Sequence, residues 1–292
     1  MNEAAVPVPV SVIVLTRDEE RNIGECLDSL AWAGDIVVLD SHSTDRTVEI
    51  AEARGARVVE RVFDDFSTHK NWALDHLELA HPWVLLVDAD ERATPALAAE
   101  IAATIARPNA RNGYYLARQN WVWGKPLRCM FPDYNLRLLR RGKGRYENRI
   151  VHEHMVIDGE AGYLRGFLVH RDAKGIERYI DRHNVYSSFE AVEVWRLLHG
   201  SNAAEISARN PFRRGPEGRR ALKQFAYRYL PARPLFQFLW LYVGKRGFLD
   251  GRRGWRYCVL RMLYEYQVSL KLEELRDPDS PMSAKYRKYL ES

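Results

Sequence analysis

The segment WVLLVDADERATP, residues 83–95, places three carboxylates directly after an apolar run. Residues 83–87 are apolar, and Asp88, Asp90 and Glu91 follow where that run ends. Negative charges at the edge of a hydrophobic core are costly unless water, a cation or hydrogen-bond donors compensate them. Side chains two residues apart in an extended chain point the same way, so Asp88 and Asp90 are expected to hold one hard cation, Mg²⁺ or Mn²⁺, together with phosphate oxygens.

Three earlier apolar runs, residues 10–15, 35–39 and 57–62, are also followed by polar side chains, and segments with helical spacing separate the runs. Apolar strands alternating with helices predict an α/β fold whose mostly parallel sheet is covered on both faces. Ligands of such sheets bind beyond the carboxyl ends of the strands. The candidate binding residues at that edge, in addition to the carboxylates above, are Thr16, Arg17, Asp18, Glu19, Asp40, Ser41, Ser43, Asp45, Lys70 and Asn71.

Some of these residues have ordinary structural explanations. Asp40 and Asp45 can cap the following helix, for which Thr44 is the predicted N-cap. Lys70 can be a solvated charge on a helix, and Asp88 with Asp90 can be a polar strand end. The segment VHEH, residues 151–154, is not predicted to bind zinc, because it lacks the second histidine of a His-Glu-x-x-His helix.

Four motifs in this order, SVIVLTRDEERNIGECLDSL, IVVLDSHSTDRTVEIAEARGARV, FSTHKNWAL and VLLVDADER, resemble family 2 glycosyltransferases of the GT-A fold. NRIVHEH is similar to a later signature of the lipopolysaccharide-core glucosyltransferase-like subgroup. The resemblance covers about residues 8–200 and implies a Rossmann-like, mostly parallel mixed sheet and inverting transfer from a nucleotide sugar, with a UDP-sugar favoured. TRDEE departs from the commoner Thr-x-Asn-Glu because Asp18 stands where asparagine is usual.

The resemblance also implies roles for individual residues. The metal ligands would be the Asp-x-Asp pair, Asp88 and Asp90, together with His170. Inverting transfer needs a base that takes the proton of the acceptor hydroxyl. That base is expected to be Glu153, with Asp133 and Glu147 as alternatives. The residues expected to contact the donor are Thr16, Arg17, Glu19, Asp40, Ser43, Lys70, Asn71 and Asp88.

The C-terminal part of the chain differs in composition. A helix is predicted over about residues 175–198, and we expect a catalytic domain over residues 1–204 followed by a helical region over residues 205–292. Residues 205–261 contain fourteen Lys and Arg against three Asp and Glu, which leaves the rest of the chain acidic. Arginine with interleaved aromatics favours binding to an anionic membrane surface. The apolar side chains expected to contact that surface are Phe236, Phe238, Leu239, Trp240 and Trp255. A packed helical subdomain is the alternative, and a nucleic-acid partner is not expected.

Composition limits the remaining possibilities. The three cysteines lie far apart in the 292 residues, which argues against a disulfide framework, and the N-terminus lacks a basic flank before its short apolar stretch. We therefore expect a cytoplasmic protein, peripheral on the inner face of the cell membrane, with a lipid-linked or lipopolysaccharide glycan as acceptor. The alternatives are a sugar-phosphate nucleotidyltransferase, disfavoured because TRDEERN has no glycine, and a non-catalytic glycan- or membrane-binding module.

Overall fold

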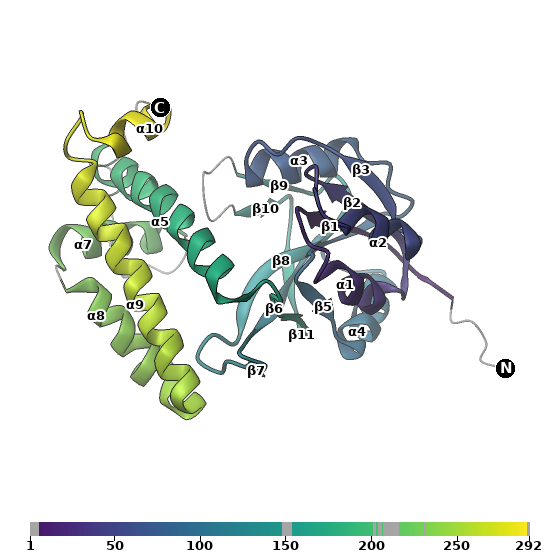
Figure 1. Ribbon diagram of the computed structural model, residues 1–292. Coiled ribbons are helices and arrows are strands. Elements are labelled where there is room, and N and C mark those ends of the chain that lie inside the picture. The colour runs from purple at the N-terminus through teal and green to yellow at the C-terminus, as the bar shows by residue number, and fades with distance from the viewer. Residues whose placement is uncertain are drawn as a thin grey trace. The chain divides into compact units, whose positions relative to one another are not determined.

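The computed structural model describes residues 6–147, 154–200, 203, 206, 216–230 and 232–290. The contacts within the chain divide it into two compact units, residues 1–175 and residues 176–292. The first unit contains a mixed sheet with helices, and the second is helical (Figure 1). The sheet and helices confirm the predicted α/β class with a helical C-terminal region.

Unit 1 is built on parallel strands near the N-terminus. The strands β1 (Val8–Thr16), β2 (Ala33–Asp40), β3 (Arg57–Glu60) and β4 (Trp83–Asp88) correspond to the four apolar runs of the sequence. They lie in the order β3-β2-β1-β4 and are mutually parallel. Their register pairs Thr16 with Asp40 and Leu15 with Asp88. The predicted polar clusters therefore lie at one edge of the sheet.

The sheet continues with strands from the second half of the unit, in the order β4-β8-β6-β11-β5. β8 is antiparallel to β4 and β6, whereas β11 is parallel to β6 and antiparallel to β5. A short strand β7 pairs with β6, and β9 with β10 forms a separate hairpin. The bounds are β5 Glu91–Ala93, β6 Gly113–Val122, β7 Lys125–Pro126, β8 Asp133–Arg140, β9 Gly144–Tyr146, β10 Met155–Ile157 and β11 Ala161–His170.

Helices cover both faces of this sheet, as the apolar strands predicted. The helices are α1 (Ile23–Leu30), α2 (Thr47–Ala53), α3 (Phe66–His76) and α4 (Pro95–Ile105). One core joins α1, α2 and α4 to the face that contains Val12 and Val14, and a second core joins α3 and the β9–β10 hairpin to the face that contains Ile13 (Figure 1). Alternate side chains of β1 thus enter opposite cores, which explains why the whole strand is apolar.

Two helices of unit 1 begin at a capping residue next to them in sequence, and a third does not. Thr94 caps α4 with Pro95 in its first turn, and Asp65 caps α3. The prediction that Thr44 caps α2 is wrong, because α2 begins at Thr47 after Arg46. The Thr44 amide instead donates to Asp18 Oδ1 at 2.8 Å, so a contact distant in sequence replaces the local cap.

Unit 2 contains α5 (Gly175–His199), α7 (Pro216–Tyr229), α8 (Arg233–Leu239), α9 (Gly251–Glu274) and α10 (Pro281–Leu290). A π-helical turn η1 (Trp240–Gly244) and a 3-10 turn η2 (Gly247–Asp250) join α8 to α9. Lys271 on α9 donates to Ser187 on α5 at 2.7 Å, and Lys223 on α7 pairs with Glu190 on α5 at 2.6 Å. Within the described residues, no helix has the length and apolarity needed to cross a membrane.

Candidate active site

Asp40 organises the edge of the sheet where β1 and β2 end. Its carboxylate is fully buried and accepts bonds from Thr16 Oγ1 at 2.8 Å, Ser43 Oγ at 2.6 Å and the Ser43 amide at 2.7 Å. These bonds tie the loop after β2 to the end of β1, which is the contact that the parallel register makes available. Asp40, Ser43 and Thr16 thus lie together at the predicted edge, where they hold the loop in place.

The loop after β1 is held by a second set of bonds to the loop after β2. The Asp18 amide donates to Ser43 Oγ at 2.8 Å, and the Asp18 carboxylate accepts from the Thr44 amide. Asp18 has φ 53°, a left-handed conformation that aspartate and asparagine adopt more readily than bulkier residues. This explains why an aspartate can stand where the resembling sequences have asparagine. Arg17 is exposed beside it.

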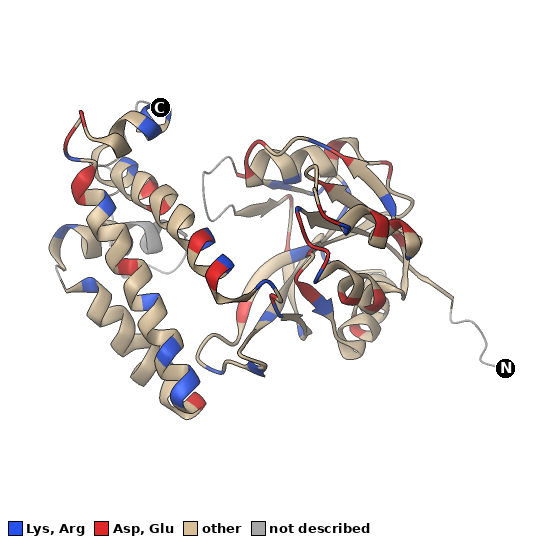
Figure 2. Ribbon diagram, viewed as in Figure 1, with Lys and Arg blue, Asp and Glu red and all other residues tan. Residues whose placement is uncertain are grey.

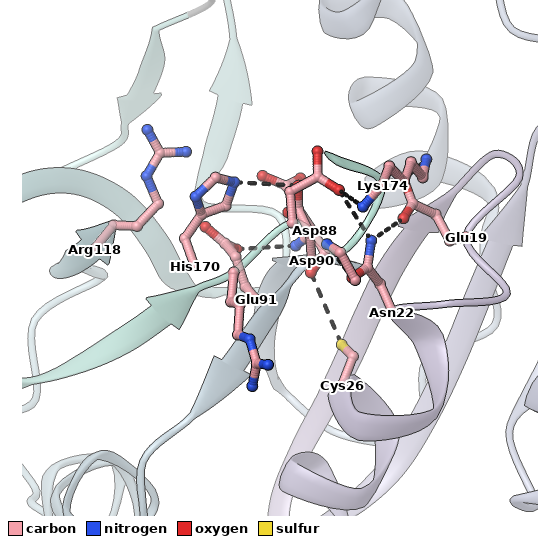
Figure 3. A network of polar contacts seen from close by, with 12 residues as sticks. Glu19, Asn22, Cys26, Asp88, Asp90, Glu91, Arg118, His170 and Lys174 are labelled. Atoms are coloured by element: carbon pink, nitrogen blue, oxygen red, sulfur yellow. Dashed lines mark hydrogen bonds and ion pairs between the residues drawn. The ribbon is translucent and has the colours of Figure 1, made fainter. Parts of the chain in front are cut away.

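The segment after β11 is attached to the same loop. Lys174 Nζ lies 2.5 Å from Glu19 Oε1 and 3.3 Å from the Arg17 carbonyl oxygen. Asn22 donates to Glu19 Oε2 at 2.8 Å and accepts from the Ala173 amide at 3.0 Å, as Figure 3 shows for Glu19, Asn22 and Lys174. Burial raises the pKa of Glu19, although Asn22 and Lys174 act in the opposite direction. Glu19 therefore joins two segments far apart in sequence.

Asp88, which the sequence paired with Asp90, has a protein partner of its own. Arg137 Nη2, from the middle of β8, lies 2.7 Å from Asp88 Oδ2 and 3.3 Å from Glu91 Oε1. Glu91 is fully buried, and its other oxygen accepts from the Asp88 amide at 3.0 Å. Burial acts to raise the pKa of Asp88, but Arg137 and Lys70 outweigh it and hold that pKa well below its usual range. Burial raises the pKa of Glu91.

Asp90 faces a different partner. The strand β4 ends at Asp88, and residues 89 and 90 form a turn, so the prediction of an extended chain between the two carboxylates is wrong. Asp90 Oδ2 lies 3.1 Å from His170 Nε2 at the end of β11, and Figure 3 shows the imidazole turned toward this carboxylate. Burial acts to lower the pKa of His170, but the Asp90 charge outweighs it and raises that pKa. The structure thus brings together Asp90 and His170, two of the three predicted metal ligands.

Lys70 and Asn71 lie on α3 near the β9–β10 hairpin. Lys70 is buried, and its Nζ lies 5.1 Å from the centre of the Tyr146 ring. The Asn71 side chain donates to the Tyr146 carbonyl oxygen at 2.9 Å and accepts from the Tyr146 amide at 2.8 Å. Asn71 therefore fixes β9 to α3, and Lys70 is close enough to Asp88 to lower the pKa of that carboxyl.

The structure describes two of the three residues that the sequence offered as the base. Glu153 lies outside the described residues, between the ends of β9 and β10. Asp133 Oδ2 accepts from Arg118 Nη2 at 2.7 Å and from Arg118 Nε at 3.1 Å. The Glu147 amide donates to the His154 carbonyl oxygen at 2.8 Å, which extends the hairpin beyond β9.

Two residues at this edge escaped the sequence predictions. Arg137 interrupts the apolar run LRLL in β8, and a charged residue between buried leucines was the available signal. Lys174, four residues after His170, had no comparable signal because its partner Glu19 lies 155 residues away. In the part of the chain that the structure describes, no three His, Cys, Asp or Glu side chains form a group that could hold a metal ion by themselves.

Comparisons with known proteins find similar sequences. The family model described as glycosyl transferase family 2 matches residues 11–170. The lipopolysaccharide core biosynthesis glycosyltransferase LpsC of Rhizobium meliloti is 31% identical over 193 residues, which is 63% of this chain and 71% of the relative. An uncharacterized glycosyltransferase of Rickettsia typhi is 28% identical over 201 residues, covering 63% and 68% of the two chains.

The fold of the chain is similar to that of a solved glycosyltransferase. The mannosyltransferase PcManGT from Pyrobaculum calidifontis, solved in complex with GDP-Man and Mn²⁺, is 16% identical and has a TM-score of 0.50. The match covers 94% of this chain and 89% of that one. At this level of identity the likeness concerns the fold, which is the GT-A arrangement that the motifs predicted.

Proposed function

The chain belongs to glycosyl transferase family 2, and from this membership we propose that it is a metal-dependent, inverting glycosyltransferase. The donor is a nucleoside-diphosphate sugar, with a UDP-sugar favoured, and the acceptor is a hydroxyl of a lipid-linked or lipopolysaccharide glycan. The relative LpsC, whose name states lipopolysaccharide core biosynthesis, supports the acceptor class. Family membership itself removes the nucleotidyltransferase and the non-catalytic binding module from consideration.

The observation that carries the proposal is the Asp90–His170 pair at the edge of the sheet. The carboxylate oxygen is the ligand type that Mg²⁺ and Mn²⁺ prefer, and the imidazole nitrogen 3.1 Å away is a ligand of first-row transition metals, which favours Mn²⁺ of the two. Two protein ligands suffice where diphosphate oxygens and water complete the shell, so the lack of a third grouped side chain among the described residues fits a cation that arrives with the donor. Mn²⁺ in the PcManGT complex supports this choice.

The neighbouring side chains suit the remaining parts of the donor. Asp88, held by Arg137, is proposed to face the ribose or a metal-bound water with its free edge, since Arg137 occupies Oδ2. Lys70 supplies a buried positive charge next to Asp88, where a diphosphate would add negative charge. Thr16, Asp40 and Ser43 hold the loops that border the nucleoside, and exposed Arg17 is proposed to contact the donor directly. The cation, when bound, stabilises the negative charge of the departing diphosphate.

The proposed reaction forms one bond and breaks one. The acceptor hydroxyl oxygen attacks the anomeric carbon from the face opposite the diphosphate, the bond from that carbon to the phosphate oxygen breaks, and Glu153 takes the hydroxyl proton. The described strands that flank Glu153 in sequence are tied to α3 by Asn71, beside Lys70.

The proposal is tested by measuring release of the nucleoside diphosphate from a panel of nucleotide sugars, with Mn²⁺, with Mg²⁺ and with a chelator. One sugar should be turned over only with metal, and at about 100 times its dissociation constant it should stabilise the protein by roughly 2.7 kcal/mol. Turnover that persists in the chelator removes the metal from the proposal. Retention of the donor anomeric configuration in the product would exclude the inverting mechanism.

A further inference from the structure

The segment that joins α8 to α9 in unit 2 exposes an unusual number of large apolar side chains. Leu235, Leu239 and Val243 are spaced four residues apart, and Phe236 and Trp240 form a parallel row with the same spacing. All five are exposed, with Trp240 at 57% and Val243 at 59%. Residues four apart lie on one side of a helix, so these side chains form one continuous apolar stripe along α8 and η1.

The opposite side of the same segment is packed, so the stripe is not what attaches the segment to unit 2. Phe238 and Leu241 are buried, and the Phe238 ring lies 5.0 Å from that of Trp255 and 5.3 Å from that of Tyr242. Phe238, which the sequence grouped with the membrane-facing aromatics, is therefore a core residue. Arg233 pairs with Glu265 and anchors the start of α8 to α9. The segment is apolar on two sides, and only one of these sides packs against other residues of unit 2.

The turn beyond the stripe adds further exposed apolar residues. Phe248 and Leu249 on η2 are exposed, and Trp255 in the first turns of α9 is 50% exposed. The η2 turn lies very close to α9, since a Cβ at Gly254 would fall 1.9 Å from the Gly247 carbonyl oxygen. The lack of a side chain at Gly254 thus allows this turn to pack closely against the helix. We call the exposed side chains of this segment the apolar tip: Leu235, Phe236, Leu239, Trp240, Val243, Phe248, Leu249 and Trp255.

The exposed charged residues of the segment that carries the apolar tip are all basic. Between residues 232 and 256 the exposed charged residues are Lys245, Arg246, Arg252 and Arg256, and the only acidic residue, Asp250, is buried. Figure 2 shows basic residues along the first turns of α9, with an acidic segment at its start. An exposed apolar surface marks a binding site, and one flanked by exposed cations is complementary to a partner that is apolar inside and negative at its surface.

We propose that the apolar tip inserts into an anionic lipid bilayer at the level of the headgroups. Trp, Phe and Leu side chains enter the acyl boundary, and Lys245, Arg246, Arg252 and Arg256 contact lipid phosphates. α8 and η1 together are twelve residues long, far short of the roughly twenty that a span requires, so the segment lies in the interface plane. This deepens the proposed function, since it names the surface that brings the enzyme to a lipid-linked acceptor.

The test is co-sedimentation of the full chain with phosphatidylcholine vesicles that contain or lack phosphatidylglycerol. The parent should bind the anionic vesicles and release from them at high salt, because exposed charges are screened. The double variant Phe236→Ser, Trp240→Ser should lower the vesicle partition coefficient at least tenfold, and Arg252→Gln, Arg256→Gln should lower it on anionic vesicles only. The matched control is Leu263→Ser, Leu270→Ser, which changes two equally exposed residues further along α9 and should bind as the parent does.

Three results would overturn the proposal. The first is equal vesicle binding by the parent and the Phe236, Trp240 variant. The second is a parent that does not bind vesicles but forms a dimer, together with a variant that is monomeric. That result would assign the surface to contact with a second copy of the chain. The third is a parent that does not bind vesicles and a variant that is less stable to heat. That result would show that these side chains stabilise the folded chain instead of binding lipid.

Transfer assays separate this inference from the proposed function. Transfer to a water-soluble acceptor oligosaccharide should be the same for the parent and the Phe236, Trp240 variant, while transfer to acceptor carried in vesicles should fall with vesicle binding. Absence of transfer by both proteins would contradict the proposed function and leave the vesicle result to decide the membrane surface on its own.

Discussion

Replacement of Arg137 by methionine should destabilise unit 1 far more than loss of an ordinary ion pair. Arg137 lies in the middle of β8 with its side chain 8% exposed, and its guanidinium compensates both Asp88 and the fully buried Glu91. Methionine fills similar space but leaves two carboxylates without their cation. Removing one partner of a buried ion pair typically costs 3–5 kcal/mol, about the whole stability of a marginal domain.

The matched control is Arg145→Met on β9. Arg145 pairs with Asp75 at 3.0 Å, but the two side chains are 66% and 42% exposed, and such surface pairs contribute about 0–1 kcal/mol. Both variants remove an arginine from a strand of unit 1 and break an ion pair to a carboxylate. The difference between them therefore isolates burial, and it should be about 3 kcal/mol or more.

The assay is hydrogen exchange of the β1 and β4 amides in increasing urea, which reports the free energy of opening of unit 1 separately from unit 2. Addition of Glu91→Gln to the methionine variant should recover part of the loss, because a buried neutral amide costs less than a buried charge. If Arg137→Met does not fold, Arg137→Lys keeps one charge and should show a smaller loss. Equal stability of Arg137→Met and Arg145→Met would refute the reasoning.

The other predictions concern the donor site, the base and unit 2. Asp90→Ala should abolish Mn²⁺-dependent binding of a nucleoside diphosphate in isothermal titration, and unchanged affinity would remove Asp90 from the site. Glu153→Gln should spare donor binding but stop transfer, and a fall of less than about tenfold, about 1.4 kcal/mol in the barrier, would direct attention to Asp133 or Glu147. Burial lowers the pKa of His183 to about 4, so this residue should destabilise unit 2 as pH falls from about 6.5 toward 4, where the unfolded chain binds the proton first. His183→Phe should weaken that pH dependence in urea unfolding, and an unchanged profile would assign the acid sensitivity to other groups.

Much of the fold was predictable because its signals are local. The apolar runs that became β1 to β4 are short and nearly continuous, and α1 buries Ile23, Cys26, Leu27 and Leu30, which have helical spacing in the sequence. The parallel arrangement then followed from the alternation of strands with helices, and with it the edge where Thr16, Asp40 and Asp88 lie. The domain boundary at residue 204 stays a prediction, and the contacts within the chain divide it after residue 175.

The partners of the acidic residues were less predictable because they come from distant parts of the chain. The sequence indicated that the negative charges after β4 need a compensating partner, and from it we predicted one metal cation for Asp88 and Asp90 together. The structure supplies Arg137 to Asp88 and His170 to Asp90, from residues 49 and 80 positions further along. No periodicity within the segment 83–95 contains that information.

The sequence by itself determined the family, the order of strands and helices, and the edge of the sheet at which the candidate site residues lie. These depend on residue type and spacing over fewer than about twenty residues, where propensity and hydrophobic periodicity act. Only the tertiary structure decided which charge faces which, and which aromatic side chains of α8 and η1 are packed and which are exposed. Phe236 and Phe238 are both phenylalanines two residues apart, yet the first is 53% exposed and the second is buried. Their difference arises from the packing of α8 on α9, because a helix turns about 200° between residues two apart and only one side can meet its neighbour.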